Sequence, residues 1–221
     1  EFTGDIFRNM SVASRMTMSN MAVEAGAKCA LFTPDEKTAA YCQIRLTDAE
    51  RTLVGDPDAS YIREITYRAE DFVPVMACPS QVDNIHPVSE LVGAPIDQVF
   101  IGSCTNGRLE DLQRAASILK GKKVAPFVKL IVTPASRKIY LEALDDGTLQ
   151  TLAEAGAIIT HPGCGLCCGR TGGILTDGER VIATNNRNFL GRMGTSKVEI
   201  YLASPATAAA CAAAGMIVVP E

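Results

Sequence analysis

The sequence predicts an α/β protein whose domains are built on mainly parallel sheets. Four short apolar segments recur in the second half of the chain, at residues 98–101, 128–132, 157–160 and 180–183. Each is followed by a loop of glycine, proline or polar residues, and helical patterns fit between them. Strands that alternate with helices in this way usually lie parallel in one sheet, because the helix carries the chain back to the starting edge.

The helices are predicted from spacing and end signals. Residues 11–27 place apolar side chains near a 3.6-residue spacing and reach Gly26 close to the end. Residues 33–36 combine a cap, a proline and two acids, which is typical of a helix start. The alanine-rich segment 204–215 predicts a buried helix. A further helix has one apolar face and a glycine stop, formed by Leu109, Leu112, Ala116, Leu119 and Gly121.

The first half of the chain is less regular. Residues 61–77 mix alternating and continuous apolar character, which predicts strands. Residues 81–93, with several prolines nearby, form the best candidate for a linker. We therefore expect two domains, at residues 1–85 and 86–221.

Composition excludes several classes of protein. The 221 residues carry a net charge of −4 and no run of lysine or arginine, so nucleic acid is not an expected partner. No apolar stretch reaches the ~18 to 20 residues that span a bilayer, so we expect no membrane partner. The first five residues resemble neither a signal peptide nor a natural start, which suggests a fragment of a longer chain.

Cysteine usage indicates a reducing compartment. The eight cysteines lie at positions 29, 42, 78, 104, 164, 167, 168 and 211. A chain this long with a full apolar complement does not need a disulfide framework, and three of the cysteines crowd into residues 164–168. We therefore expect a cytoplasmic protein that uses thiolates for a metal. In their apolar or helical contexts, Cys29, Cys42, Cys78 and Cys211 are expected to pack as small hydrophobes.

Chemistry is expected where the predicted strands end, because ligands bind outside the carboxyl ends of parallel strands. Cys164 and Cys167 form a Cys-x-x-Cys pair in a glycine-rich loop, and Cys104 follows another strand. The pair alone fits zinc, thioredoxin-like chemistry or a cluster, and Cys168 with the glycines disfavours the thioredoxin-like use. Structural zinc stays open, with Cys168 or His161 as the fourth ligand. Three thiolates would instead leave one iron of a [4Fe–4S] cluster open as a Lewis acid.

Three segments together resemble the signature segments of the aconitase superfamily. They are residues 101–106, Ile-Gly-Ser-Cys-Thr-Asn; residues 161–167, His-Pro-Gly-Cys-Gly-Leu-Cys; and residues 186–194, Asn-Arg-Asn-Phe-Leu-Gly-Arg-Met-Gly. Residues 15–27 and 201–208 also fit, so the resemblance covers essentially the whole chain in order. It implies aconitase-like, three-layer α/β/α domains. Residues 1–85 would be a middle domain truncated at its N-terminus, and residues 86–221 the cluster-bearing domain.

Residues 169–179 are most similar to the archaeal-type branch of the superfamily, whose large subunits are separate chains. The resemblance there is to 3-isopropylmalate dehydratases, which serve leucine biosynthesis, with homoaconitases and 2,3-dimethylmalate dehydratases as alternatives. It implies a hydro-lyase that isomerises a hydroxy-di- or tricarboxylic acid by dehydration and rehydration. It also implies a small subunit as partner, and this chain alone is expected to be inactive because it lacks the small subunit's segments and the family's N-terminal half.

The resemblance also implies residue roles. The cluster would be [4Fe–4S] with one iron not ligated by protein, and its ligands would be Cys104, Cys164 and Cys167. Asn20 and Glu24 match a catalytic polar pair near the cluster, and their spacing of four places them on one helix face. Substrate would be bound by Asn186, Arg187 and Arg192, since arginine clamps carboxylates in a bidentate manner.

Some residues depart from the family pattern or suggest another class of protein. Cys168 stands where relatives usually carry leucine or isoleucine, and we interpret it as an apolar substitute. Glu110 and Asp111 are expected to be solvated acids at a helix start. A zinc-stabilised interaction domain is the non-enzyme alternative. An RNA-binding role is disfavoured because the chain is acidic and has no basic stripe.

Overall fold

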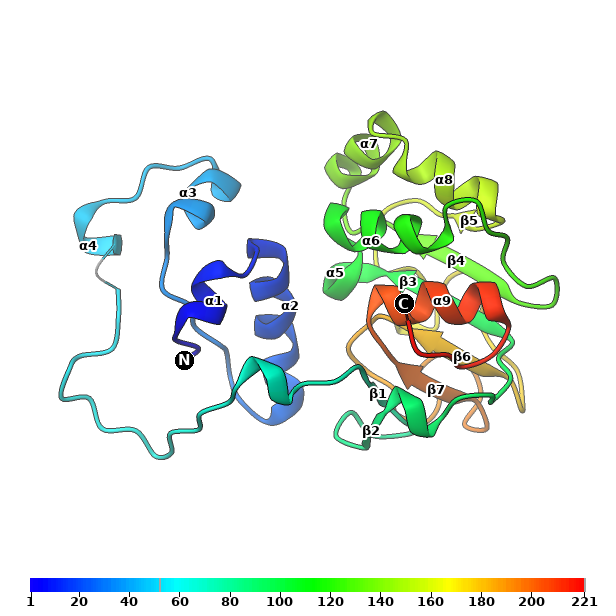
Figure 1. Ribbon diagram of the computed structural model, residues 1–221, viewed down its shortest axis with the longest axis horizontal. Coiled ribbons are helices and arrows are strands. Elements are labelled where there is room, and N and C mark those ends of the chain that lie inside the picture. The colour runs from blue at the N-terminus through cyan, green and yellow to red at the C-terminus, as the bar shows by residue number, and fades with distance from the viewer. Residues whose placement is uncertain (52, 221) are drawn as a thin grey trace. The chain divides into compact units, whose positions relative to one another are not determined.

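The computed structural model describes residues 1–51 and 53–220, which fold as two compact units, Glu1–Val73 and Pro74–Glu221 (Figure 1). This division falls earlier than the boundary expected between residues 85 and 86. The reason is that residues 75–87 form two strands that join the sheet of the second unit. The expected linker at 81–93 therefore lies inside that unit.

The first unit is mainly helical. Its elements are α1 (Asp5–Asn9), α2 (Val12–Ala22), η1 (Val23–Ala25), α3 (Glu36–Cys42), α4 (Asp48–Arg51) and η2 (Ala69–Asp71). The Ser11 side chain caps α2 by accepting a bond from the Ser14 N–H at 3.0 Å, and Gly26 ends η1 in the left-handed region. The predicted helix over 11–27 is thus confirmed.

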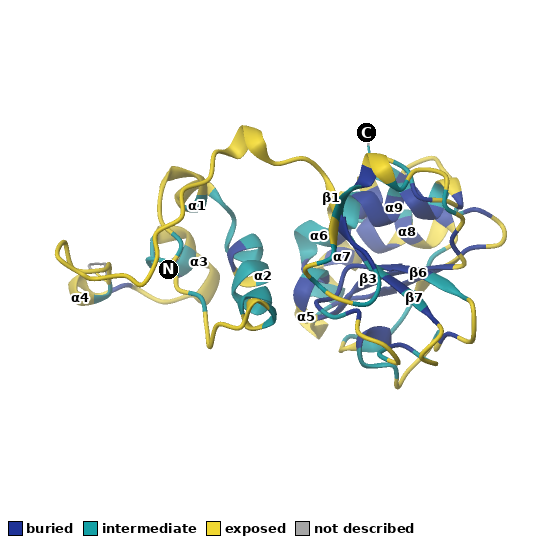
Figure 2. Cartoon of the chain, turned by 90° about the horizontal axis from the view of Figure 1, so that it is seen from below, coloured by how far each residue is buried: buried dark blue, intermediate teal, exposed yellow. Residues whose placement is uncertain are grey.

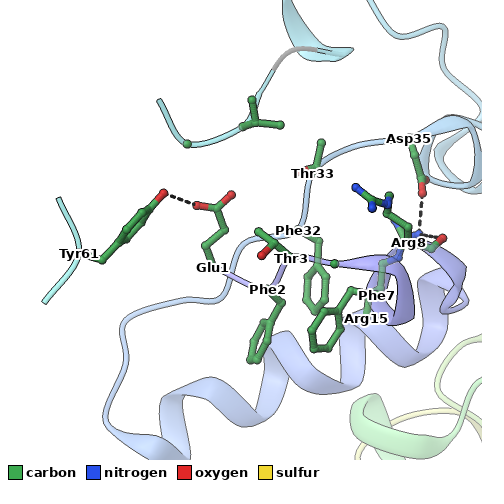
Figure 3. Close-up of a pocket in the computed structure, with 13 residues that line it drawn as sticks. Glu1, Phe2, Thr3, Phe7, Arg8, Arg15, Phe32, Thr33, Asp35 and Tyr61 are labelled. Atoms are coloured by element: carbon green, nitrogen blue, oxygen red, sulfur yellow. Dashed lines mark hydrogen bonds and ion pairs between the residues drawn. The ribbon is translucent and has the colours of Figure 1, made fainter. Parts of the chain in front are cut away.

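Aromatic stacking and one ion pair hold the first unit together. The rings of Phe2, Phe7 and Phe32 lie 5.2 to 6.0 Å apart and line a cavity of about 390 Å³ (Figure 3). Arg15, which is 5% exposed, donates to the Asp35 carboxylate at 2.6 Å. Burial alone would raise the pKa of Asp35, but its bonds to Arg15 and to the N-terminus of α3 outweigh this and lower it to about 2.

The strands predicted over 61–77 form only at the end of that range. Residues 61–74 are irregular apart from η2 and are exposed throughout (Figure 2). The exposed side chains include apolar ones such as Ile62 and Phe72. The prediction is therefore wrong for 61–74. Alternation alone does not make a strand, because the backbone N–H and C=O groups need a neighbouring strand to pair with. Among the described residues, this unit has only the isolated bridge between Phe2 and Phe32.

The second unit is built on a seven-stranded sheet in the order β2-β1-β7-β6-β3-β4-β5. The strands are β1 (Val75–Ala77), β2 (Ile85–Pro87), β3 (Gln98–Gly102), β4 (Lys129–Thr133), β5 (Ile158–Ile159), β6 (Arg180–Ala183) and β7 (Glu199–Leu202). The five strands from β7 to β5 are parallel, and β1 is antiparallel to both of its neighbours. The four predicted strands and the mainly parallel sheet are confirmed, whereas the sequence analysis did not predict β7.

The longer helices of this unit cover one face of the sheet, and a short 3-10 turn and irregular loops cover the other. The helical elements are η3 (Val88–Glu90), α5 (Ser103–Asn106), α6 (Leu109–Leu119), α7 (Arg137–Asp145), α8 (Thr148–Ala155), η4 (Gly165–Cys168) and α9 (Pro205–Ala214). Leu112 of α6, Leu152 of α8 and Ala208 of α9 belong to one buried apolar cluster with Val99 and Ile101 of β3. The predicted alanine-rich helix is thereby confirmed as α9.

On the opposite face, Phe100 of β3 packs against Leu166, Leu175 and Met193. The third layer of this unit therefore consists of η4 and of loops following β5 and β6, rather than of long helices. This arrangement places glycine-rich segments directly against the sheet. No helix among the described residues has the length and apolar character needed to cross a membrane.

The order of connections creates a switch point between β3 and β6. The chain runs outward from β3 through β4 to β5, and then returns to β6 on the other side of β3. In open parallel sheets such a reversal opens a crevice at the carboxyl ends of the two strands. The loops after β3 and β6 therefore lie where a ligand site is expected.

Candidate functional site

The loop after β3 turns sharply and carries Cys104 on the single turn α5. Gly102 has φ of 150°, and a Cβ there would lie 2.2 Å from the Thr133 carbonyl oxygen, so only glycine fits. Ser103 has φ of 68°, a left-handed conformation that is uncommon for a residue with a side chain. The residue that carries the thiol therefore follows two unusual backbone conformations.

Hydrogen bonds tie this loop to the one after β6. The Gly102 N–H donates to the Thr184 hydroxyl at 2.9 Å, and the Asn106 side-chain amide donates to the Thr184 carbonyl at 2.8 Å. Thr184 is buried, so the bond from Gly102 is shielded from water, while the bond from Asn106 is partly buried. Thr184 thus links the Cys104 loop to the segment that follows β6, which includes Asn185, Asn186 and Arg187.

The loop after β5 carries Cys164 and Cys167. The hydroxyls of Thr133 and Thr160 lie 2.6 Å apart at the ends of β4 and β5 and join the two strand ends. Gly165 has φ of 54°, and a Cβ there would lie 2.5 Å from the Thr133 hydroxyl, so the loop folds closely over β4. As a result Cys167 is buried, at 4% exposed, while Cys164 and Cys104 remain exposed.

The loops that carry the cysteines follow β3 and β5 at the same edge of the sheet. Partial desolvation raises the pKa of the Cys164 thiol, and the neighbouring thiols of Cys167, Cys104 and Cys168 raise it further, while Arg192 acts in the opposite direction. All eight cysteines are free thiols. Within the described part of the chain, no three His, Cys, Asp or Glu side chains are grouped closely enough to hold a metal ion.

Two of the three predicted substrate residues, Asn186 and Arg192, lie beside Cys167. Asn186 is 9% exposed, and its side-chain oxygen lies 4.0 Å from the Cys167 sulfur. Arg192 points a guanidinium nitrogen at the same sulfur, 3.7 Å away, and stacks over the Phe189 ring at 5.3 Å from its centroid. Arg187 belongs to the same loop, and its carbonyl accepts a bond from the Asn185 amide at 2.9 Å.

A cavity of about 350 Å³ opens beside the cysteine loop. Its polar lining includes the hydroxyls of Thr133, Thr160 and Thr171, together with His161 and Cys164. Cys168 also lines it, and is half-buried with its thiol donating to the Gly165 carbonyl at 3.7 Å. The hydroxyl groups would suit a polar ligand.

Asn20 and Glu24 belong to the first unit. Asn20 lies on the last turns of α2, and Glu24 lies in η1, which continues the helix. Both are half-buried, and the continuous helical path keeps them on one face as the spacing predicts. Their role beside the cysteines of the second unit stays a prediction.

Sequence reasoning missed Arg108, which is 7% exposed. Its guanidinium donates to the Cys104 carbonyl at 2.7 Å and to the Thr105 carbonyl at 2.6 Å. Asp111 accepts a bond from the Arg108 N–H at 3.0 Å and is partly buried, so the expectation of a solvated acid is wrong. The position of Asp111 in the first turn of α6 suggested exposure, but in the fold its carboxylate is bonded to the backbone of Arg108 and partly covered.

Four other cysteines divide between the two units. Cys78 and Cys211 are buried, as expected for small hydrophobes. Cys29 and Cys42 are exposed, so that expectation is wrong for them. The reason is that the first unit buries few side chains: its buried apolar residues are Ala39 and Leu46 within the described ranges.

Comparison with known proteins identifies the family. The sequence model of the aconitase family (aconitate hydratase) matches residues 1–95 and 90–215. The chain therefore belongs to the aconitase family, which confirms the resemblance of its motifs.

Individual relatives are similar over the whole chain. It is 52% identical over 221 residues to 3-isopropylmalate dehydratase large subunit 1 of Methanopyrus kandleri, covering 100% of this chain and 53% of the relative. It is 52% identical over 221 residues to the probable methanogen homoaconitase large subunit of Methanosarcina mazei, covering 100% and 56%. The chain thus spans about half the length of the curated relatives it matches.

Proposed function

We propose that this chain is the cysteine-bearing part of a hydro-lyase large subunit. The reaction is the isomerisation of a hydroxy-di- or tricarboxylic acid by dehydration and rehydration, with isopropylmalate as substrate in leucine biosynthesis. The placement of Cys104 after β3 and of Cys164 and Cys167 after β5, with Arg192 beside Cys167, is the observation that supports the proposal. Membership of the aconitase family supports it. Because the similar relatives include a homoaconitase large subunit, homoaconitate is the alternative substrate, with 2,3-dimethylmalate as a further candidate.

The donor set fits an iron–sulfur cluster better than a single metal ion. A zinc ion draws four ligands to within about 2.3 Å of one point, which would require Cys168 or His161 beside the three cysteines. A [4Fe–4S] cluster instead distributes its thiolates over different iron atoms. Cys104, Cys164 and Cys167 would hold it and leave one iron without a protein ligand. The cluster, when bound, supplies a Lewis acid for the leaving hydroxyl group.

The chain's own residues bind and orient the substrate. Arg187 and Arg192 bind its carboxylates, because a planar guanidinium pairs with a carboxylate through two parallel hydrogen bonds. Stacking of Arg192 on Phe189 restricts the plane in which that guanidinium can present its donors. Asn186, next to the Cys167 sulfur, orients groups near the thiolates.

Proton handling is assigned to the first unit. Glu24 takes or returns a proton, and Asn20, on the same helix face, holds the departing hydroxide or water by hydrogen bonds. A separate small subunit completes the site, so the chain alone is inactive. We also propose a cytoplasmic location, because eight free thiols are typical of a reducing compartment. Neither nucleic acid nor a membrane is a proposed partner.

Anaerobic reconstitution with iron and sulfide tests the cofactor. The chain should turn brown, show charge-transfer absorbance and contain iron, and Cys167→Ser should lose most of this iron. Cys168→Ser is the matched control, since it changes the neighbouring thiol and should retain the cluster. Stoichiometric zinc without iron after anoxic purification would contradict the proposal in favour of a zinc-stabilised domain.

The substrate is tested with the small subunit present. The reconstituted complex is assayed on isopropylmalate, homoaconitate, dimethylmalate and citrate, and isopropylmalate should give the highest kcat/KM. A higher value for homoaconitate would transfer the assignment to homoaconitase. Turnover by this chain without an added subunit would show that the partner is not needed.

A further inference from the structure

The turn that carries Cys104 is bonded through its carbonyl groups to a residue outside it. Residues Ser103–Asn106 form one helical turn, and the last four carbonyls of any helix have no N–H donor inside that helix. In a turn this short, carbonyls can therefore accept bonds from donors outside it. An unpaired carbonyl in a covered position is costly, so such a turn needs an outside donor to keep its shape.

Arg108 is that donor. One guanidinium nitrogen donates to the Thr105 carbonyl at 2.6 Å, and another donates to the Cys104 carbonyl at 2.7 Å. These bonds are short and come from a charged donor, which makes them stronger than bonds between neutral groups. The planar fork of arginine satisfies two successive carbonyls at once, which a lysine ammonium on a flexible stem does less well.

The Arg108 side chain belongs to a residue that is fixed at the start of the packed helix α6. Arg108 is the residue just before α6, and its own N–H donates to Asp111 in the first turn of that helix. The buried leucines Leu112 and Leu119 hold α6 against the sheet. The guanidinium therefore connects a packed helix to the backbone of Cys104, which follows the strained Ser103.

We propose that Arg108 is a positioning residue for the cysteine site: by bonding the Cys104 and Thr105 carbonyls it fixes the Cys104 thiol in the place where it can ligate the cluster. This inference rests on the proposed function. It assigns Arg108 no contact with substrate. Its effect on chemistry passes entirely through the position of Cys104, much as outer-shell groups orient metal ligands in other sites.

The test measures cluster retention in three variants of the full chain. Arg108→Gln removes the fork and the charge, and Arg108→Lys keeps the charge. Arg114→Gln is the matched control, because Arg114 is exposed on the same helix α6. After anaerobic reconstitution, decay of the charge-transfer absorbance is followed in the presence of an iron chelator. Arg108→Gln should lose the cluster about 10- to 100-fold faster than wild type, the range typical of outer-shell partners. Arg108→Lys should lie between them.

A second readout does not need the cluster. In the cluster-free chain, alkylation of each cysteine is followed by mass spectrometry, with exposed Cys29 as an internal reference. The Cys104 rate should rise in Arg108→Gln while the Cys29 rate stays the same. Circular dichroism checks that each variant is folded, and Arg108→Lys replaces Arg108→Gln if the latter is not.

The outcomes separate the two proposals. If wild type takes up no iron, the proposed cofactor is wrong. If wild type loads but Arg108→Gln retains the cluster as long as Arg114→Gln does, the positioning role is wrong and the cluster stands. If Arg108→Lys equals wild type in both readouts, the two-carbonyl fork is not needed and the inference is overturned.

Discussion

Asp111 is predicted to destabilise the fold at neutral pH. Burial raises the pKa of its carboxyl group from 3.8 to about 6, although the bond from the Arg108 N–H and the charge of Arg108 act in the opposite direction. The position in the first turn of α6 would ordinarily favour an ionised acid. Here desolvation of the charge is the larger effect.

The magnitude follows from linkage between pKa and stability. A folded-state pKa about 2 units above the unfolded value corresponds to roughly 3 kcal/mol, at ~1.4 kcal/mol per unit. Because the folded-state pKa is raised, the contribution to stability is fully present below about pH 4 and is lost as the pH rises through about 6. Above that, the ionised carboxylate is held in the fold at a cost.

Asp111→Asn removes the charge and keeps an oxygen that accepts the bond from the Arg108 N–H. The weaker bond and the lost attraction to the guanidinium offset part of the gain. We expect the free energy of unfolding to rise by about 1 to 2 kcal/mol at pH 7. At pH 3.5 the variant and wild type should differ little, because both side chains are then neutral.

Urea unfolding at pH 3.5 and pH 7 measures the difference, with Glu110→Gln as the neighbouring control. The control should show no comparable gain at pH 7. A loss of stability in Asp111→Asn at pH 7, or an equal change at both pH values, would refute the reasoning. Either result would mean that the carboxylate is better solvated or better paired than its burial implies.

Three further predictions concern the glycine loop, the core and the first unit. Gly165→Ala should lose iron on reconstitution and should lower the free energy of unfolding by about 1 to 3 kcal/mol more than Gly172→Ala does. Gly172 also has a positive φ, but a Cβ there would meet open space. Equal melting temperatures of the two variants would contradict this. Leu112→Ala should lower the free energy of unfolding in urea by about 2 to 5 kcal/mol. Arg114→Ala, at an exposed position, should lower it by less than about 0.5 kcal/mol. Asp35→Asn should lower the free energy of unfolding by about 1 to 2 kcal/mol at pH 7, a value reduced because the ion pair is partly exposed. Since the pKa of Asp35 is lowered to about 2, the difference between variant and wild type should fade as the pH falls from 4 to 2.

The prediction of β3 succeeded because this strand is buried on both faces. All five residues of β3 are buried, so its continuous apolar run was a reliable signal. The failure at residues 61–74 has the opposite cause, since alternating apolar residues there have no neighbouring strand. The strand β7 has only four residues, two of them buried, which is too short a pattern to predict alone.

The sequence motifs pointed to the cysteines of the candidate site but not to the residues that bond their loops. Cys104, Cys164 and Cys167 stand in motifs whose glycines are visible in the sequence, and these motifs pointed to strand ends. Arg108 gave no such signal, because its partners are backbone carbonyls that any sequence possesses. Only the folded turn α5 shows which carbonyls the Arg108 guanidinium reaches.

By itself, the sequence determined the family, the parallel sheet and the glycines that allow the loops to approach the strands, and it supplied the candidate thiol donors. These properties depend on residue type and on spacing along the chain. The tertiary structure decided that Cys167 is buried beside Asn186 and Arg192, that Asp111 is shielded from water, and that the sheet begins at residue 75. Burial and pairing of this kind arise between residues distant in sequence, so they exist only once strands and loops have packed together.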